Sequence, residues 1–223
     1  MTLASLTKLL QLASPTLPVG AYSYSQGLEA AVEARVVSDE PSAAAWIRDV
    51  MALSLRSMEA PVFLRLAAAW HAGDRARAIL WNEEFVASRE TRELRAETLQ
   101  MGYSLRQLLQ SLDVPEASRL DAFDELAYPT AFTFAAAAWN IAPREALAAY
   151  LFAWIENQVL AAVKAVPLGQ TAGQRMLLAL SGEIEAVVEA AADLGDGDLH
   201  NFAPGLALLS SLHETQYTRL FRS

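Results

Sequence analysis

Few side chains of this 223-residue chain could do chemistry, and none forms a recognisable catalytic set. Three histidines and no cysteine are present, which excludes disulfides, thiolate metal sites and cysteine nucleophiles. His213-Glu214 begins like the HExxH motif of zinc proteases, but Tyr217 occupies the position of the second histidine. One of the two zinc ligands that must share a helix face is therefore missing.

Asp196, Asp198 and His200 alternate in a glycine-rich loop and could approach a cation together. Their spacing does not match a calcium-binding EF-hand, and Gly195 and Gly197 are sufficient to explain a loop. We therefore interpret this segment as a plain loop.

Nucleotide binding and hydrolysis also lack their motifs. Residues Gly169 to Gln174 offer neither the spacing nor the lysine of a phosphate-binding P-loop, and no GxSxG nucleophile elbow occurs. No pair of carboxylates stands out from the acidic residues on the helix surfaces. We predict a protein that is not an enzyme and binds no cofactor directly.

The composition is typical of a globular, acidic protein. Hydrophobic residues make up 53% and charged residues 19% of the chain, and the net charge is −9. This charge repels phosphate backbones, so we expect no nucleic-acid partner. The uncharged, alanine-rich run from Leu126 to Pro143 falls short of a spanning helix and contains Pro129, and no export signal is apparent. We expect a cytoplasmic protein without a membrane segment.

Apolar residues recur at helical spacing along nearly the whole chain, and no segment alternates with the period of two that strands require. We predict an all-α protein: a single-domain helical bundle of about ten helices with a flexible C-terminal tail. Ser38 or Asp39 should cap one helix, and Pro61 should bend or restart the chain. Further expected helices cover about 74–87, 89–112, 116–127 (weaker), 130–142, a long segment from Pro143, and a segment from about Gln170 to Asp193.

One of these helices is apolar on nearly all sides. Between Ala146 and Gln174 only Glu156 and Lys164 carry a charge, so the helix through Trp154 must be covered all around. Two arrangements satisfy this requirement. The helix is the centre of the bundle, or a second subunit covers part of it.

Four segments carry more polar residues and glycines than helix packing requires. The first, PVGAYSYSQGLE (residues 18–29), crowds two tyrosines, two serines and two glycines at the entry to a helix. Gly27 costs about 1 kcal/mol relative to alanine inside a helix, which implies close approach of another part of the protein. A capped loop before a packed helix start is the plainer alternative.

The second segment, SRETRE (residues 88–93), continues to Arg95. On a helix, Arg89, Arg92 and Arg95 stack at three-residue spacing, and Glu90 likewise stacks on Glu93. Since like charges are then neighbours, local pairing does not explain the pattern. We expect most ionic partners on another helix or another chain, with a solvated charged face as the alternative.

The third segment, VKAVPLGQ (residues 163–170), places Lys164 alone at the end of an apolar helix, where the helix dipole also favours a cation. The fourth is the tail HETQYTRLFRS, which combines aromatic residues with arginine as interface anchors do. We predict an all-helical domain at 1–212 and a partner-binding tail at 213–223 that orders on binding. A disordered end without a role is the alternative.

Together the four segments resemble the motifs of the urease accessory protein family UreF. These motifs are an LPVG-aromatic-S-x-S-x-GLE segment, an SRETRE-like helix, a VK-x-VP-x-GQ turn and an HETQYTRLFRS-like tail. All four occur in this order between Leu17 and Ser223. The stretch from about Asp113 to Pro143 has no distinctive match.

The resemblance implies a homodimer that joins the UreD/UreH scaffold and the GTPase UreG. That assembly acts on the urease apoprotein while nickel is inserted, so nickel and GTP are handled by the complex. The resemblance places the 22–29 segment and Lys164 near the GTPase, and residues 217–221 against the scaffold. The residues expected at partner surfaces are Tyr22, Ser25, Gly27, Glu29, Arg89, Glu90, Arg92, Glu93, Lys164, Pro167, Tyr217, Arg219, Leu220 and Phe221.

Two alternatives to a pure adaptor remain open. The chain could accelerate GTP hydrolysis by its partner through an inserted arginine, for which Arg89, Arg92 and Arg219 are the candidates. It could instead carry nickel directly, although three scattered histidines without cysteine offer few ligands for a closed site in one subunit.

Overall fold

Helix caps and prolines divide the chain into a series of helices joined by turns. The computed structural model describes residues 1–223 and contains no β-strand, which confirms the all-α prediction. The α-helices are α1 (Leu3–Leu12), α2 (Leu28–Glu33), α3 (Glu40–Val50), α4 (Ala60–His71), α5 (Arg75–Ala87), α6 (Arg92–Ser111), α7 (Tyr128–Ala138), α8 (Pro143–Ala165), α9 (Gln170–Ser181), α10 (Ile184–Asp193) and α11 (Pro204–His213). The shorter elements are the 3-10 turns η1 (Ala21–Ser23), η3 (Ala117–Ala122) and η4 (Asp196–Asp198), and the π-helical η2 (Met51–Glu59).

α3, η2 and α4 form one continuous helical segment. Asp39 caps its start by accepting a hydrogen bond from the Ser42 amide at 2.9 Å, as predicted. Pro61 does not restart the chain, because the wider π-helical turns precede it. The carbonyl of Ser57, four residues before the proline, instead accepts a hydrogen bond from the His200 amide at 3.2 Å.

Four predicted helices differ from the structure, and one of them, expected at 130–142, spans Tyr128–Ala138 as α7. The helix expected at 89–112 begins only at Arg92, because Thr91 adopts an extended conformation and caps it. The weaker helix expected at 116–127 is reduced to the 3-10 turn η3. The helix expected to run to Asp193 is two helices, because a turn at Gly182 separates α9 from α10.

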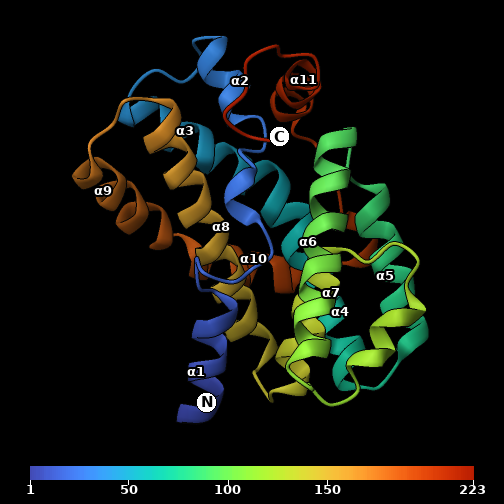
Figure 1. Cartoon of the computed structure of the whole chain (residues 1–223). Helices are drawn as coiled ribbons and strands as arrows, with labels where there is room; N and C mark the ends of the chain where they lie inside the picture. The colour runs from blue at the N-terminus through green and yellow to red at the C-terminus, as the bar shows by residue number, and fades with distance from the viewer.

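α8 is the centre of the molecule, as one of the two predicted arrangements required. It packs against α1, α2, α3, α4, α7, α9 and α10 (Figure 1). By length and composition alone it could cross a membrane, but 56% of its most apolar window is buried inside the protein, as in the core helix of a soluble protein. A second group, formed by α4 to α7, packs beside it.

The prediction of a flexible C-terminal tail is wrong. After α11 the chain folds back, and Figure 1 shows its end beside α11 and α2, far from the N-terminus. The Arg222 amide donates to the Ser23 carbonyl at 2.6 Å, and the Ser25 amide donates to the Ser223 carbonyl at 2.6 Å. Phe221 and Ser223 are buried, so apolar burial and backbone hydrogen bonds offset the entropy of ordering the tail. The boundary expected between residues 212 and 213 falls inside α11.

Candidate functional site

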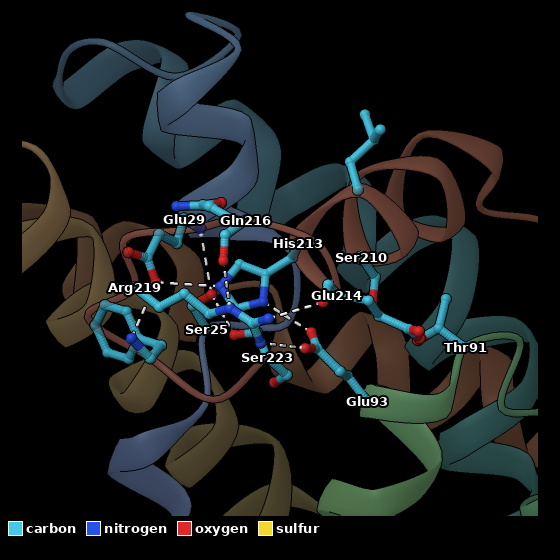
Figure 2. Close-up of polar contacts among 12 residues, drawn as sticks. Ser25, Glu29, Thr91, Glu93, Ser210, His213, Glu214, Gln216, Arg219 and Ser223 are labelled. Carbon is cyan, nitrogen blue, oxygen red and sulfur yellow. Dashed lines mark hydrogen bonds and ion pairs between the residues drawn. The ribbon is translucent and has the colours of Figure 1, made fainter.

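Three of the four motif segments meet at one place, between α2, the start of α6 and the end of α11. We call the four ionisable side chains there, Glu29, Glu93, His213 and Arg219, the polar junction. Figure 2 shows the imidazole of His213 between the two carboxylates. The contact between Glu29 and His213 alone joins residues that lie 184 positions apart in the sequence.

His213 is fully buried, with both ring nitrogens against carboxylate oxygens. Its Nδ1 lies 2.7 Å from Glu93 Oε2, and its Nε2 lies 3.2 Å from Glu29 Oε2. Because an ionised carboxylate only accepts hydrogen bonds, both nitrogens must donate for both contacts to be favourable. The geometry thus fits an imidazolium held between two carboxylates.

The two carboxylates also fix the tail. Glu29 accepts hydrogen bonds from the backbone amides of Leu220 and Phe221, at 2.7 and 2.9 Å. Glu93 accepts from Arg219 Nη1 at 2.8 Å (Figure 2). The junction therefore pairs two negative with two positive groups, and these contacts hold the backbone of the tail in one conformation.

The backbone before α2 makes this approach possible. Gln26 and Gly27 both adopt positive φ angles, 51° and 78°. A side chain at Gly27 would place its Cβ 3.3 Å from Leu206 Cδ1 and 3.4 Å from the Ser210 amide nitrogen. The predicted close approach at Gly27 is confirmed, and the neighbour is α11 of the same chain.

The SRETRE segment also behaves as predicted, since its ionic partners lie on other elements. Arg89 pairs with Glu59 of η2 at 3.1 Å, and Arg92 pairs more loosely with Glu214 at 3.6 Å. Arg89 precedes α6, so the expected stack of three arginines on one helix does not form.

A second polar group, which the sequence analysis missed, lies deeper, behind the junction. Glu59 is buried and accepts hydrogen bonds from Arg89 and from the Tyr150 hydroxyl. Burial and the neighbouring Glu59 carboxylate raise the pKa of Tyr150 well above its ordinary value. The sequence offered only a weak signal, a single acidic residue followed by the apolar segment APVFL.

Glu97, one turn after Glu93 on α6, is the other buried carboxylate of this group. It accepts hydrogen bonds from Gln26 Nε2 at 2.7 Å and from Ser223 Oγ at 3.1 Å. The Gln26 carbonyl in turn accepts from Trp154 Nε1 at 2.7 Å. Burial raises the pKa of Glu97 from 4.5 to about 7, against the opposing effect of these hydrogen bonds.

The VKAVPLGQ segment reaches the same region from the surface. Lys164 is exposed, and its Nζ lies 5.7 Å from the centre of the Phe221 ring, within range of a cation–π contact. Pro167 is exposed at the end of α8. The other three motif segments are thus all close to the tail.

The predicted partner-binding residues divide by burial. Those buried inside the chain are Ser25, Gly27, Glu29, Glu93 and Phe221. Those partly exposed are Tyr22 and Arg89. Those exposed are Glu90, Arg92, Lys164, Pro167, Tyr217, Arg219 and Leu220. The buried set forms contacts within the fold, so only the other two sets have side chains open to a partner in this conformation.

The Asp196–His200 segment behaves as a loop. Asp196 pairs with Arg65 at 2.6 Å, and His200 Nδ1 lies 2.9 Å from the Asp198 carbonyl. No three histidine, aspartate or glutamate side chains anywhere in the chain are grouped so that they could hold a metal ion.

Comparison with known proteins identifies the family. The family model UreF matches residues 37–181. Proteins named urease accessory protein UreF are 59% identical in Azoarcus sp. (strain BH72), 54% in Ralstonia pickettii (strain 12J) and 51% in Dechloromonas aromatica (strain RCB). These alignments cover at least 99% of this chain and at least 97% of each relative. The chain therefore belongs to the UreF family of urease accessory proteins.

Proposed function

We propose that this protein is a non-catalytic adaptor of urease maturation that joins the GTPase UreG to the UreD/UreH scaffold on the urease apoprotein. Family membership supports the role in urease maturation. In this proposal the protein is a cytoplasmic homodimer, and nickel and GTP are handled by the complex. The scaffold binds the tail, and the GTPase binds the neighbouring surface with Lys164 and Pro167.

One observation supports the tail as the scaffold surface. Its backbone is held by the polar junction, but the side chains of Tyr217 and Leu220 are 102% and 68% exposed. Exposed aromatic and aliphatic side chains on a fixed backbone lose little conformational entropy on binding. Exposed apolar residues also occur on α11, at Leu208 and Leu212, and just before it, at Phe202.

The test is a double variant, Tyr217→Ala with Leu220→Ala, in co-purification with the scaffold protein. Both side chains are exposed, so the circular dichroism spectrum and melting temperature should stay unchanged while scaffold binding is lost. Leu178→Ala on α9 is the matched control, because Leu178 is 78% exposed and lies on another element. Undiminished scaffold binding by the double variant would refute this assignment.

Point variants are preferable to deletion of the whole tail. Removing residues 213–223 would also remove His213 and Arg219, and would leave two buried carboxylates without cationic partners. A truncated chain would lose binding and folding together.

A second candidate function is stimulation of GTP hydrolysis by UreG, and exposure favours one of the three candidate arginines. The Arg92 side chain is 80% exposed, compared with 9% for Arg89 and 34% for Arg219. Arg92 is therefore the side chain most able to reach a partner's phosphates.

Single-turnover GTP hydrolysis by UreG separates the two functions. A pure adaptor leaves the rate unchanged. An activator raises it, and Arg92→Ala should then abolish the increase while Arg75→Ala, a change at an exposed arginine on α5, preserves it.

A further inference from the structure

A cavity of about 70 Å³ lies between η2, α6, α7 and α8. We call it the Glu97 cavity. The lining residues used below are Glu59, Arg89, Glu97, Tyr128, Tyr150 and Trp154. At roughly 10–15 Å³ per water molecule, the volume suits a few waters or one very small ligand.

The charges that face this cavity do not balance. Three of the five N–H groups of the Arg89 guanidinium are engaged: Nη1 donates to Glu59, and Nε and Nη2 donate to Ser88 Oγ. Glu97 is 5% exposed, and its hydrogen-bond partners, Gln26 and Ser223 Oγ, are neutral. Since Arg89 pairs with Glu59, an ionised Glu97 leaves one negative charge in excess at the cavity.

The remaining walls suit a cation. The rings of Tyr128 and Tyr150 lie 5.6 Å apart, and the indole of Trp154 also faces the cavity. Aromatic faces attract a desolvated cation. The Tyr128 hydroxyl forms no hydrogen bond within the protein, and burial raises its pKa well above the ordinary value, so this phenol is a neutral group with a free oxygen.

The same geometry argues against a divalent metal ion. Each oxygen of Glu59 already accepts one hydrogen bond, from Tyr150 or from Arg89, and each oxygen of Glu97 accepts one from Gln26 or Ser223. Two carboxylates with partly occupied oxygens fall short of the six or more oxygen ligands that Mg²⁺ or Ca²⁺ requires. A monovalent cation that can donate hydrogen bonds needs fewer partners, because each carboxylate oxygen of Glu97 has a second lone pair.

We propose that the Glu97 cavity binds a small ammonium-type cation, ammonium or a short primary alkylammonium. Its N–H groups donate to Glu97 and to the free Tyr128 oxygen, and its positive charge lies against the aromatic rings. This site is separate from the surfaces assigned to the scaffold and the GTPase, so it stands or falls independently of the adaptor function.

Such a ligand would also affect the tail. Glu97 holds Gln26, which precedes α2, and Ser223 at the end of the chain. A cation that keeps Glu97 ionised strengthens both hydrogen bonds, since charged acceptors bind more tightly than neutral ones. Occupancy of the cavity should therefore slow hydrogen exchange in the 22–27 segment and in the tail.

The test is a titration of the full chain with ¹³C-methylammonium chloride at pH 8, with sodium chloride at equal ionic strength as the reference. We expect saturable binding in the millimolar range or tighter, and nuclear Overhauser effects from the methyl group to tyrosine ring protons. Tetramethylammonium, which is bulkier and has no N–H donor, should not bind.

Protons should compete with the cation, because burial raises the pKa of Glu97 to about 7. The titratable groups around Glu97 are Glu59, Arg89 and Tyr24, with Tyr128 and Tyr150 in the cavity wall. The affinity of the cavity for methylammonium should therefore fall about tenfold from pH 8 to pH 6.

Two variants and one control decide the outcome. Glu97→Gln keeps the shape and should weaken binding at least tenfold, whereas Glu90→Gln removes an equal charge at an exposed position and should change nothing. Ala153→Val narrows the cavity without altering any charge and should also abolish binding, which covers the case that Glu97→Gln fails to fold. The proposal would be overturned if the wild type showed no saturable binding, or if both cavity variants bound methylammonium as tightly as the wild type.

Discussion

Two carboxylates one turn apart on α6 have opposite electrostatic surroundings. Glu93 and Glu97 are both buried, 9% and 5% exposed. Glu93 contacts two basic side chains, His213 and Arg219. Glu97 contacts only neutral donors. The same residue type on the same helix face therefore belongs to a balanced cluster in one case and to an unbalanced cavity in the other.

The difference separates what holds the tail from what lies behind it. In the polar junction, ion pairs offset the cost of burying charge, so the junction can stabilise one conformation of the tail. In the Glu97 cavity that cost is not offset, and it appears as a pKa raised to about 7. A buried group that changes charge near neutral pH is suited to respond to a ligand or to protons.

The largest effect should follow from removing the central cation of the junction. His213→Ala leaves Glu29 and Glu93 buried without the imidazolium between them. Breaking a buried ion pair in this way costs about 3–5 kcal/mol. Urea denaturation should show this loss in the free energy of unfolding.

His200→Ala is the matched control for that variant. His200 is exposed, and its ring contacts only the Asp198 carbonyl, so the free energy of unfolding should change by less than about 0.5 kcal/mol. Equal effects of the two substitutions would show that the junction does not stabilise the fold.

The second-largest effect, that of Glu97→Gln, should be a gain rather than a loss in the free energy of unfolding. The folded protein binds a proton at Glu97 more tightly than the unfolded chain, so this group stabilises the fold below pH 4.5, and the contribution is lost as the pH rises to about 7. Raising the pKa from 4.5 to about 7 corresponds to about 3 kcal/mol. Glu97→Gln should therefore stabilise the protein by about this amount at pH 8, and by less than about 1 kcal/mol at pH 5.

Glu93→Gln makes the comparison within one helix. It removes the anion that His213 and Arg219 share, so it should destabilise the protein at pH 8, where Glu97→Gln stabilises it. Urea denaturation of both variants at the two pH values measures this contrast. If both shift stability in the same direction, the distinction between the two regions is wrong.

A smaller and more local effect is expected at Glu29. Glu29→Gln replaces the charged acceptor of the Leu220 and Phe221 amides with a neutral carboxamide, at a cost of about 1–2 kcal/mol. Hydrogen exchange at these two amides should accelerate about tenfold. Exchange in the centre of α8 should not change, because Glu29 acts on the tail rather than on the core.

Much of the fold could be predicted from local patterns. Helical periodicity gave the all-α class, and the near absence of charge around Trp154 required α8 to be covered, either at the centre of the bundle or by a second subunit. The structure has it at the centre. The capping pattern gave the start of α3 at Asp39. The π-helical turns of η2 were not predicted, because tertiary contacts such as that between Ser57 and His200 accompany them. The break at Gly182 was also missed, although a glycine marks it in the sequence.

The candidate site could be predicted only in part. Its motif segments were visible because they are short, local and rich in polar residues. Their roles were not, since the pairing of Glu29 with His213 spans 184 positions, and no local pattern shows that two such residues meet. Glu59 and Glu97 were missed for the same reason: in the sequence they look like ordinary acidic residues on helices.

The smallest effect should come from an ion pair outside both regions. Arg48 and Glu183 lie 2.8 Å apart, as close as Arg219 and Glu93, but their side chains are 46% and 39% exposed. Solvent screens such a pair, and holding two long side chains in place costs entropy, so Arg48→Gln should change the free energy of unfolding by about 0.5 kcal/mol or less. The change should vanish in 0.5 M sodium chloride, whereas the loss in His213→Ala should persist, because salt ions cannot enter the buried junction. If Arg48→Gln costs as much as His213→Ala, burial does not decide the strength of ion pairs in this protein, and the contrast between Glu93 and Glu97 needs another explanation.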